Sequence, residues 1–163
     1  MKNVIYPPEI VSIDSNIIFL AGPIQGACQW QDKAITIIHT LNDKIVIANP
    51  RRRYLDGEFV YNAQVDWETH FLQQATEKGT VLFWLAKEYE HICTRAYAQT
   101  SRFELGEWKT KHEYSGANLI VGIEEGFTNA KYIKRRLSQD CPRVPICSSL
   151  KQSCQKAVEL LAL

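Results

Sequence analysis

The chain has 163 residues, of which 45% are hydrophobic, so it can bury one core but is too short for two independent catalytic domains. We therefore expect a single domain over residues 1–163. Its formal net charge of +1 creates no overall field that would attract a polyanion, and this argues against a nucleic acid polymer as the partner. Residues 1–10 carry Pro7-Pro8 in place of a basic and then a long apolar segment, so we expect neither a signal peptide nor a membrane anchor, and a cytoplasmic protein.

The five cysteines are odd in number and form no Cys-x-x-Cys pair, which argues against a disulfide framework and against a zinc knuckle. His91 and Cys93 could supply two metal ligands, but no second pair accompanies them. The favoured interpretation is therefore reduced, mostly packed thiols, with no metal site and no cofactor.

Apolar runs of strand length alternate with longer amphipathic stretches along the chain. In chain order we predict a strand at 16–21, a helix at 29–41, a strand at 44–48, a helix at 59–78, a strand at 80–85, a helix at 101–112, a strand at 118–123, a helix at 129–137, a short strand at 143–146 and a helix at 149–163. This alternation is typical of βα units and predicts an α/β fold with a central parallel sheet.

Two stretches of this pattern need separate comment. Residues 80–85 form the most apolar run and are expected to be the central strand, since both faces of such a strand are covered by helices. Residues 87–98 follow no clean period and are interpreted as a loop or a short lid.

In folds of this class, ligands bind beyond the carboxyl ends of the strands. The segments that follow the predicted strands are residues 22–26, 49–52, those after Leu85, and 124–126. The Gly22-Pro23 turn could cradle a phosphate or a sugar hydroxyl, although such a pair is more often only a turn. Arg51 and Arg52 could clamp a phosphate or could belong to a solvated basic loop.

Two helical segments carry further candidates. Gln64 and Glu68 are four residues apart and share one helix face, which an ordinary surface hydrogen bond would also explain. Ser101 and Glu104 match the Ser-x-x-Glu capping box, in which the serine caps the helix and the glutamate reaches back to the serine amide. The same geometry suits catalysis, because a helix N-terminus favours the ionised carboxylate that a nucleophile requires. The local pattern alone favours the cap, while Gly106 leaves room for close approach of a ligand or a backbone.

Five short segments occur together in a defined order: IFLAGP at 18–23, NPRR at 49–52, QVDWE at 64–68, LFWL at 82–85 and SRFELGEW at 101–108. Together they resemble the nucleoside 2-deoxyribosyltransferase-like family, particularly its branch with the NPRR and Trp-Glu motifs. The likeness extends over about residues 16–126, and five ordered motifs are far more specific than any one of them.

The resemblance implies a flavodoxin/Rossmann-like three-layer sandwich with a parallel sheet of four to five strands. It also implies a double displacement in which Glu104 attacks the anomeric carbon, expels the base and forms a glycosyl ester that a second base or water resolves. The Gly22-Pro23 turn would lie against the sugar, and Glu68 or Asp66 would hold the base or protonate it, with the shared face of Gln64 favouring Glu68. The predicted catalytic residues are thus Glu104 and Glu68, and the predicted substrate-binding residues are Gly22, Pro23, Asn49, Arg51, Arg52, Gln64, Asp66 and Ser101.

Several activities fit this resemblance. The chain is predicted to cleave or transfer the N-glycosidic bond of a nucleoside or nucleotide; hydrolysis of a nucleotide or an NAD derivative and non-catalytic sensing of a nucleotide are the alternatives. Relatives tend to form symmetric oligomers, so a homo-oligomer is expected.

Overall fold

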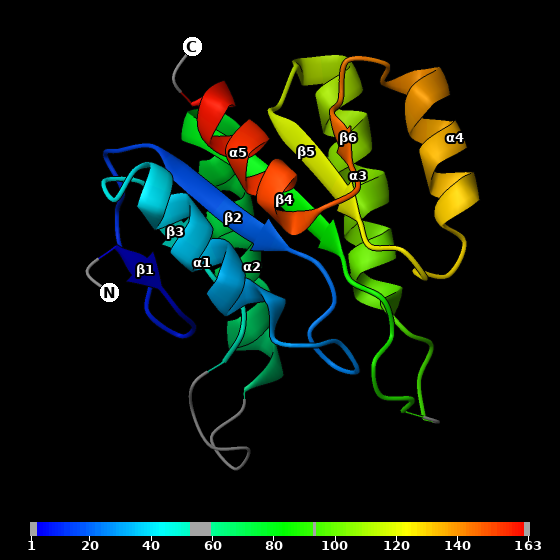
Figure 1. The fold of residues 1–163 in the computed structure, drawn as a ribbon. Coiled ribbons are helices and arrows are strands. Elements are labelled where there is room, and N and C mark those ends of the chain that lie inside the picture. Colours follow the sequence, from blue (N-terminus) through cyan, green and yellow to red (C-terminus); the bar gives the residue numbers. More distant parts are fainter. Residues whose placement is uncertain (1–2, 53–59, 93, 162–163) are drawn as a thin grey trace.

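In the computed structural model, which describes residues 3–52, 60–92 and 94–161, strands and helices alternate along most of the chain (Figure 1). The strands are β1 (Val4–Ile5), β2 (Ile17–Ala21), β3 (Val46–Ala48), β4 (Gly79–Leu85), β5 (Leu119–Ile123) and β6 (Ile146–Cys147). The helices are α1 (Trp30–Leu41), α2 (Tyr61–Lys78), α3 (Gln99–Ser115), α4 (Ala130–Asp140) and α5 (Leu150–Leu160). All strands pair in parallel in the order β1-β3-β2-β4-β5-β6.

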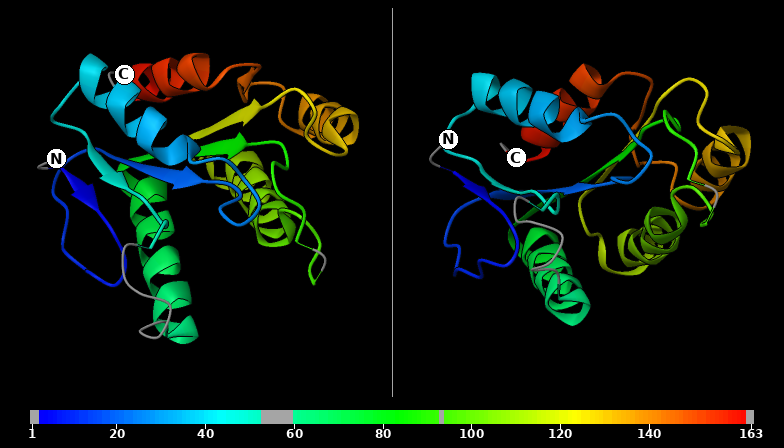
Figure 2. Two further views of the ribbon diagram at one scale, coloured as in Figure 1. Left: turned by 60° about the horizontal axis from the view of Figure 1, so that its bottom comes forward. Right: turned by 90° about the horizontal axis from the view of Figure 1, so that it is seen from below.

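Helices cover both faces of this sheet. Helices α1 and α5 lie on one face, and α2 and α3 lie on the other (Figure 2). This is the predicted flavodoxin/Rossmann-like three-layer sandwich, with six strands in place of the four to five that were expected. The strand missing from the prediction is β1, which has two residues, too few to show a period, and is held by parallel pairing with β3. None of the helices in the described ranges is long and apolar enough to cross a membrane.

Strand β4 lies in the interior of the sheet, between β2 and β5, as its apolar sequence predicted. Successive side chains of a strand point to opposite faces, and here both faces are buried. Phe83 packs with the α2 and α3 layer, whereas Leu82 and Trp84 pack with the α1 and α5 layer. A strand covered on both sides needs apolar residues at every position, which explains the uninterrupted run.

The turn after β2 approaches β4 closely. Gly22 has a φ angle of 145°, and a Cβ atom at this position would collide with the carbonyl oxygen of Trp84. Only glycine adopts such a backbone without strain and leaves this space free. The residue therefore brings the end of β2 directly alongside the end of β4.

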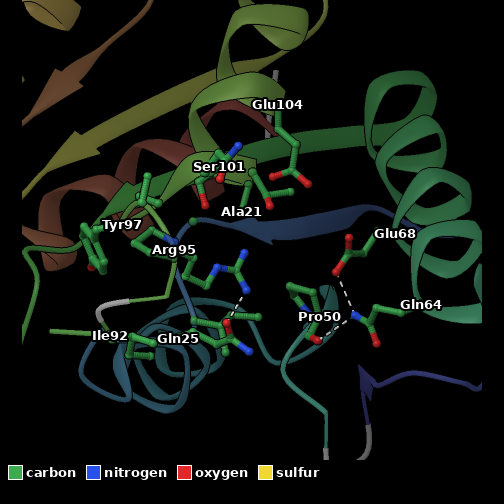
Figure 3. A pocket seen from close by; sticks show the side chains of 18 of the residues that line it. Ala21, Gln25, Pro50, Gln64, Glu68, Ile92, Arg95, Tyr97, Ser101 and Glu104 are labelled. Carbon is green, nitrogen blue, oxygen red and sulfur yellow. Dashed lines mark hydrogen bonds between the residues drawn. The ribbon is translucent and has the colours of Figure 1, made fainter. Parts of the chain in front are cut away.

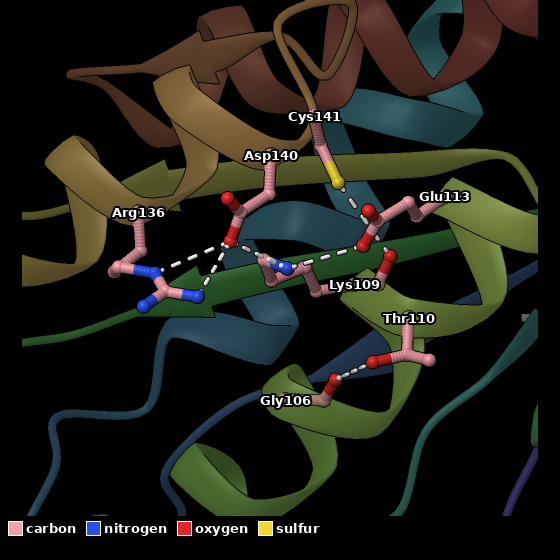
Figure 4. Close-up of polar contacts among 7 residues, drawn as sticks. All are labelled: Gly106, Lys109, Thr110, Glu113, Arg136, Asp140 and Cys141. Atoms are coloured by element: carbon pink, nitrogen blue, oxygen red, sulfur yellow. Dashed lines mark hydrogen bonds and ion pairs between the residues drawn. The ribbon is translucent and has the colours of Figure 1, made fainter.

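An ion-pair cluster joins α3 to α4 (Figure 4). Lys109 Nζ lies 2.8 Å from Asp140 Oδ2 and 3.4 Å from Glu113 Oε2, and Arg136 Nη2 lies 2.8 Å from the same Asp140 oxygen. The two cations hold the pKa of the Asp140 carboxyl below its usual value, mainly through their hydrogen bonds. The cluster ties the outer part of α3 to the neighbouring helix.

Candidate active site

A cavity of about 280 Å³ opens at the carboxyl ends of β2, β3 and β4 (Figure 3). Its walls are the turn after β2, the segment after β3, the starts of α2 and α3, and the segment 87–98 between β4 and α3. The position follows the rule for open parallel sheets, in which ligands bind beyond the carboxyl ends of the strands. The volume lies near the lower limit of sites for small molecules.

Two carboxyl groups point into this cavity from different helices. Glu68 belongs to α2 and Glu104 belongs to α3, and both line the pocket (Figure 3). The two helices cover the same face of the sheet, which brings the residues together although they are far apart in the sequence. The Glu68 charge therefore acts on the Glu104 carboxyl group.

The expected capping box at Ser101 and Glu104 is wrong. Helix α3 begins at Gln99, and Ala98 before it adopts a left-handed conformation with φ of 55° and makes no side-chain cap hydrogen bond. Ser101 thus lies inside the first turn, and Glu104 lies in the second turn. The Glu104 carboxylate makes no hydrogen bond or ion pair with any residue of the described ranges.

Glu104 was also expected to be ionised by the helix N-terminus, and the burial of its carboxyl group contradicts this. Burial, followed by the neighbouring negative charges of Glu68 and Glu107, raises the pKa of Glu104 from 4.5 to about 8. The helix field decays within the first turn and does not offset burial in the second. At neutral pH Glu104 therefore carries a proton.

Glu68 has a similar burial but better partners. Burial raises the pKa of Glu68, whereas a hydrogen bond from Gln64 and the positive charge of Arg52 oppose this rise. The Gln64 Nε2 atom lies 2.7 Å from Glu68 Oε1. Since Glu104 has no such partner, the anionic form of Glu68 is the better stabilised of the two carboxylates.

The cavity collects most of the residues predicted from the sequence. Those that line it are Gly22, Pro23, Arg52, Gln64, Glu68, Ser101 and Glu104.

Three predicted residues do not line the cavity. Asn49 is fully buried, and its Oδ1 accepts a hydrogen bond from the Arg51 backbone amide. The Arg51 side chain turns away from the cavity and donates to Gln31 Oε1 at 3.2 Å. Asp66 is exposed on α2, so of the two acids considered for protonating the base, Glu68 alone lies at the pocket.

The segment 87–98 supplies one wall of the pocket, and sequence reasoning assigned it no functional residue. Tyr97 lines the cavity, and its hydroxyl donates to the carbonyls of Ala86 at 2.6 Å and Lys87 at 3.0 Å. The Gly26 carbonyl accepts hydrogen bonds from the amides of Tyr89 at 2.7 Å and Glu90 at 3.1 Å. These bonds fold the end of the segment back onto the residues directly after β4 and hold its first part against the turn after β2.

A side-chain contact joins the same two walls at the cavity. Arg95 of the segment 87–98 donates a hydrogen bond to the Gln25 side chain of the turn after β2 (Figure 3). The sequence contained no periodic signal for this wall, because its contacts are loop contacts. An isolated arginine and tyrosine in an irregular stretch were the available cues. The residues after β5, 124–126, contribute nothing to the described lining.

The fold and the cavity define an α/β protein with an acidic pocket at the edge of a parallel sheet, in which Glu68 and Glu104 belong to two helices on the same face of that sheet. Glycosidic-bond chemistry uses such a pair of acids. The chain belongs to the nucleoside 2-deoxyribosyltransferase-like family, whose model matches residues 15–127. Membership confirms the resemblance found in the sequence and gives the protein the general character of a glycosyltransferase-type enzyme for nucleosides. Among curated proteins, no match to the chain is found.

Proposed function

We propose that the protein cleaves or transfers the N-glycosidic bond of a nucleoside or nucleotide through a glycosyl ester on Glu104. The observation that carries this proposal is the Glu104 carboxyl group, which faces the cavity without a partner among the described residues and opposite a second acid. Family membership supports the same chemistry. A purely structural carboxyl group would be expected to have a partner when it is this poorly solvated.

The raised pKa of Glu104 requires a proton transfer before the attack. Glu68 ionises more readily than Glu104, so it is the anion available to accept the Glu104 proton, directly or through water. The ionised Glu104 oxygen then bonds to the anomeric carbon, and the electron pair of the breaking carbon–nitrogen bond moves to the base nitrogen. Glu68 returns the proton to the leaving base.

A second displacement releases the sugar. Glu68, ionised again, removes a proton from water or from an acceptor base, whose oxygen or nitrogen attacks the anomeric carbon and displaces Glu104. Two displacements retain the configuration at that carbon. Water as acceptor gives hydrolysis, and a base as acceptor gives transfer.

A phosphorylated substrate is the second candidate. Arg52 and Arg95 both line the cavity, and guanidinium groups bind phosphate oxygens with two donors. Glu88 and Glu90 line the same cavity and oppose an anion. A comparison of nucleosides, nucleoside monophosphates and NAD, each with and without an acceptor base, distinguishes these substrates.

Intact-mass analysis tests the proposal. Incubation with a 2′-deoxy-2′-fluoro nucleoside or nucleotide is expected to give a covalent adduct that maps to Glu104, because the fluorine slows resolution of the ester. Glu104→Gln should give no adduct and no turnover while remaining folded. Glu77→Gln, an exposed acid on α2 that does not line the cavity, is the matched control and should behave like the wild type.

A non-catalytic nucleotide sensor is the competing interpretation. It would explain Glu104 as a helix cap, and the cap geometry does not support that role. Under this hypothesis Glu104→Gln keeps ligand affinity, and neither the unchanged protein nor the variant releases base. Loss of base release in the variant alone favours the enzyme.

We further infer that the protein acts in the cytoplasm as a homo-oligomer. The tendency of similar proteins to form symmetric oligomers supports the assembly, and so does Val60, which is 60% exposed where α2 begins. This end of α2 projects beyond the sheet (Figure 2). Light scattering tests the assembly, and a fully active monomer would contradict it.

A further inference from the structure

Gln64 connects the segment after β3 to one of the two pocket acids. Its side chain is buried, with 9% exposed, and its Nε2 atom lies 3.1 Å from the Pro50 carbonyl oxygen and 2.7 Å from Glu68 Oε1. A carbonyl oxygen can only accept, so the Gln64 atom facing Pro50 must be the nitrogen. The same NH₂ group therefore presents a donor to Glu68 (Figure 3).

We propose that Gln64 is a positioning residue that holds Glu68 in its ionised form and so leaves the proton of the pocket on Glu104. The sequence had suggested Gln64 as a substrate-binding residue. The inference rests on the proposed function, because it concerns the two acids to which that function assigns the chemistry.

The acceptor on the other side of Gln64 is itself fixed. Asn49 is fully buried, and its Oδ1 accepts from the Arg51 amide at 3.0 Å, a contact that spans Pro50. This local turn fixes the direction of the Pro50 carbonyl, which in turn fixes the Gln64 amide. The NPRR motif therefore acts on Glu68 at a distance, although neither Asn49 nor the Arg51 side chain reaches the cavity.

The amide discriminates between the two protonation states of Glu68. A carboxylate accepts a hydrogen bond from NH₂ more strongly than a neutral carboxyl group does, so the contact favours the charged form. Arg52 on the segment after β3 acts in the same direction. The other ionisable side chains in the described lining of the cavity are Tyr61 of α2 and Glu88, Glu90, Arg95 and Tyr97 of the segment 87–98. Glu107 acts on Glu104 from α3.

The consequence for the reaction concerns the first proton transfer. The proton leaves the Glu104 carboxyl oxygen and bonds to a Glu68 oxygen, and the negative charge moves in the opposite direction. The Gln64 hydrogen bond opposes this step in the free protein, because it stabilises the state before transfer. Substrate binding has to overcome it, which ties the formation of the nucleophile to the presence of a substrate.

The test measures the ionisation of Glu68 and Glu104 directly and does not depend on enzymatic activity. Carboxyl ¹³C NMR titration of the unliganded full chain should show Glu68 ionising at lower pH than Glu104. In Gln64→Met, which keeps the side-chain length and removes the donor, the pKa of Glu68 should rise by about one or more, as expected for loss of a hydrogen bond to a charged group. Gln73→Met, an exposed glutamine on α2, is the matched control and should change neither titration.

A second variant keeps the test decisive if the first does not fold. If Gln64→Met does not fold, as judged by thermal denaturation, Gln64→Glu keeps the shape of the side chain and should raise the pKa of Glu68 in the same direction. An unchanged Glu68 titration in the folded variant, or Glu104 ionising first in the unchanged protein, would overturn the inference. Absence of a Glu104 adduct in the intact-mass experiment would instead contradict the proposed function. It would not change the titration results expected for Glu68 and Glu104.

Discussion

The Glu104→Gln substitution should make the protein more stable at neutral and alkaline pH. Folding raises the pKa of Glu104 from 4.5 to about 8, so the protonated carboxyl group favours the folded state. This contribution is complete below about pH 4.5 and is lost as the pH rises to about 8. A pKa difference of one corresponds to about 1.4 kcal/mol. The raised pKa of Glu104 therefore lowers the free energy of unfolding by about 3 kcal/mol at pH 7 and by at most about 5 kcal/mol above pH 8, relative to its value below pH 4.5. Glutamine carries no such charge and removes the cost.

Urea denaturation at pH 4.5, 7 and 8.5 measures this effect. The stability difference between Glu104→Gln and the unchanged protein should grow by about 3 kcal/mol from pH 4.5 to pH 7, equivalent to about 6–12 °C in Tm for a domain of this size. Glu77→Gln, an exposed acid on α2, should show no such growth. If Glu104→Gln and the wild type lose stability in parallel across this pH range, the assignment of a raised pKa to Glu104 is refuted.

Three other substitutions have defined outcomes. Glu68→Gln removes a charge that raises the pKa of Glu104, so Glu104 should ionise at lower pH in an NMR titration, and turnover should fall by about 10²–10⁴-fold through loss of the proton donor. An unaltered rate would show that another group protonates the base. Gly106→Ala should raise the free energy of unfolding in urea by about 0.5–1 kcal/mol, because a Cβ there meets no atom of the described residues within 4 Å and the site is helical. No described backbone approaches Gly106 closely, so that part of the expectation for this residue is wrong. Gly22→Ala should lower Tm strongly through collision with Trp84, and an unchanged Tm would contradict that contact.

The strands were predictable because their burial is nearly uniform. Strands β2 and β4 are buried at every residue, so their apolar runs stood out from the amphipathic helices between them. Strand β1 could not be found in this way, since a two-residue strand is defined by its partner β3 and carries no pattern of its own. Residue 59 of the predicted second helix and residues 162–163 of the last lie outside the described ranges, as does Cys93.

The parts of the site that lie in the family motifs were predictable from the sequence. The wall formed by the loop segment 87–98 was not, because its contacts are between loops. Glu68 and Glu104 followed from the family motifs, and the sheet topology brings them to one cavity. The start of α3 was misplaced because the helix begins at Gln99, directly after a left-handed Ala98, and no local signal separates this start from one at Ser101. The charge of Glu104 was also misjudged, since burial depends on neighbours that no local pattern reveals.

The burial of the Glu104 carboxyl group without a hydrogen-bond partner among the described residues is stronger evidence for a ligand than the sequence motif is. A carboxyl group that neither caps α3 nor pairs with a cation among the described residues lowers stability near neutral pH, whereas an apolar or amide side chain of similar size would not. Packing alone gives no reason for an acid here, and the nearby Glu68 charge makes ionisation harder still. Both features become useful once an electrophilic sugar carbon occupies the cavity. After its proton has moved to Glu68, the Glu104 carboxylate stabilises the developing positive charge of the transition state, and the protonated Glu68 can protonate the leaving base. The cost in the free protein and the gain in the transition state thus have one physical origin, a poorly solvated pair of acids.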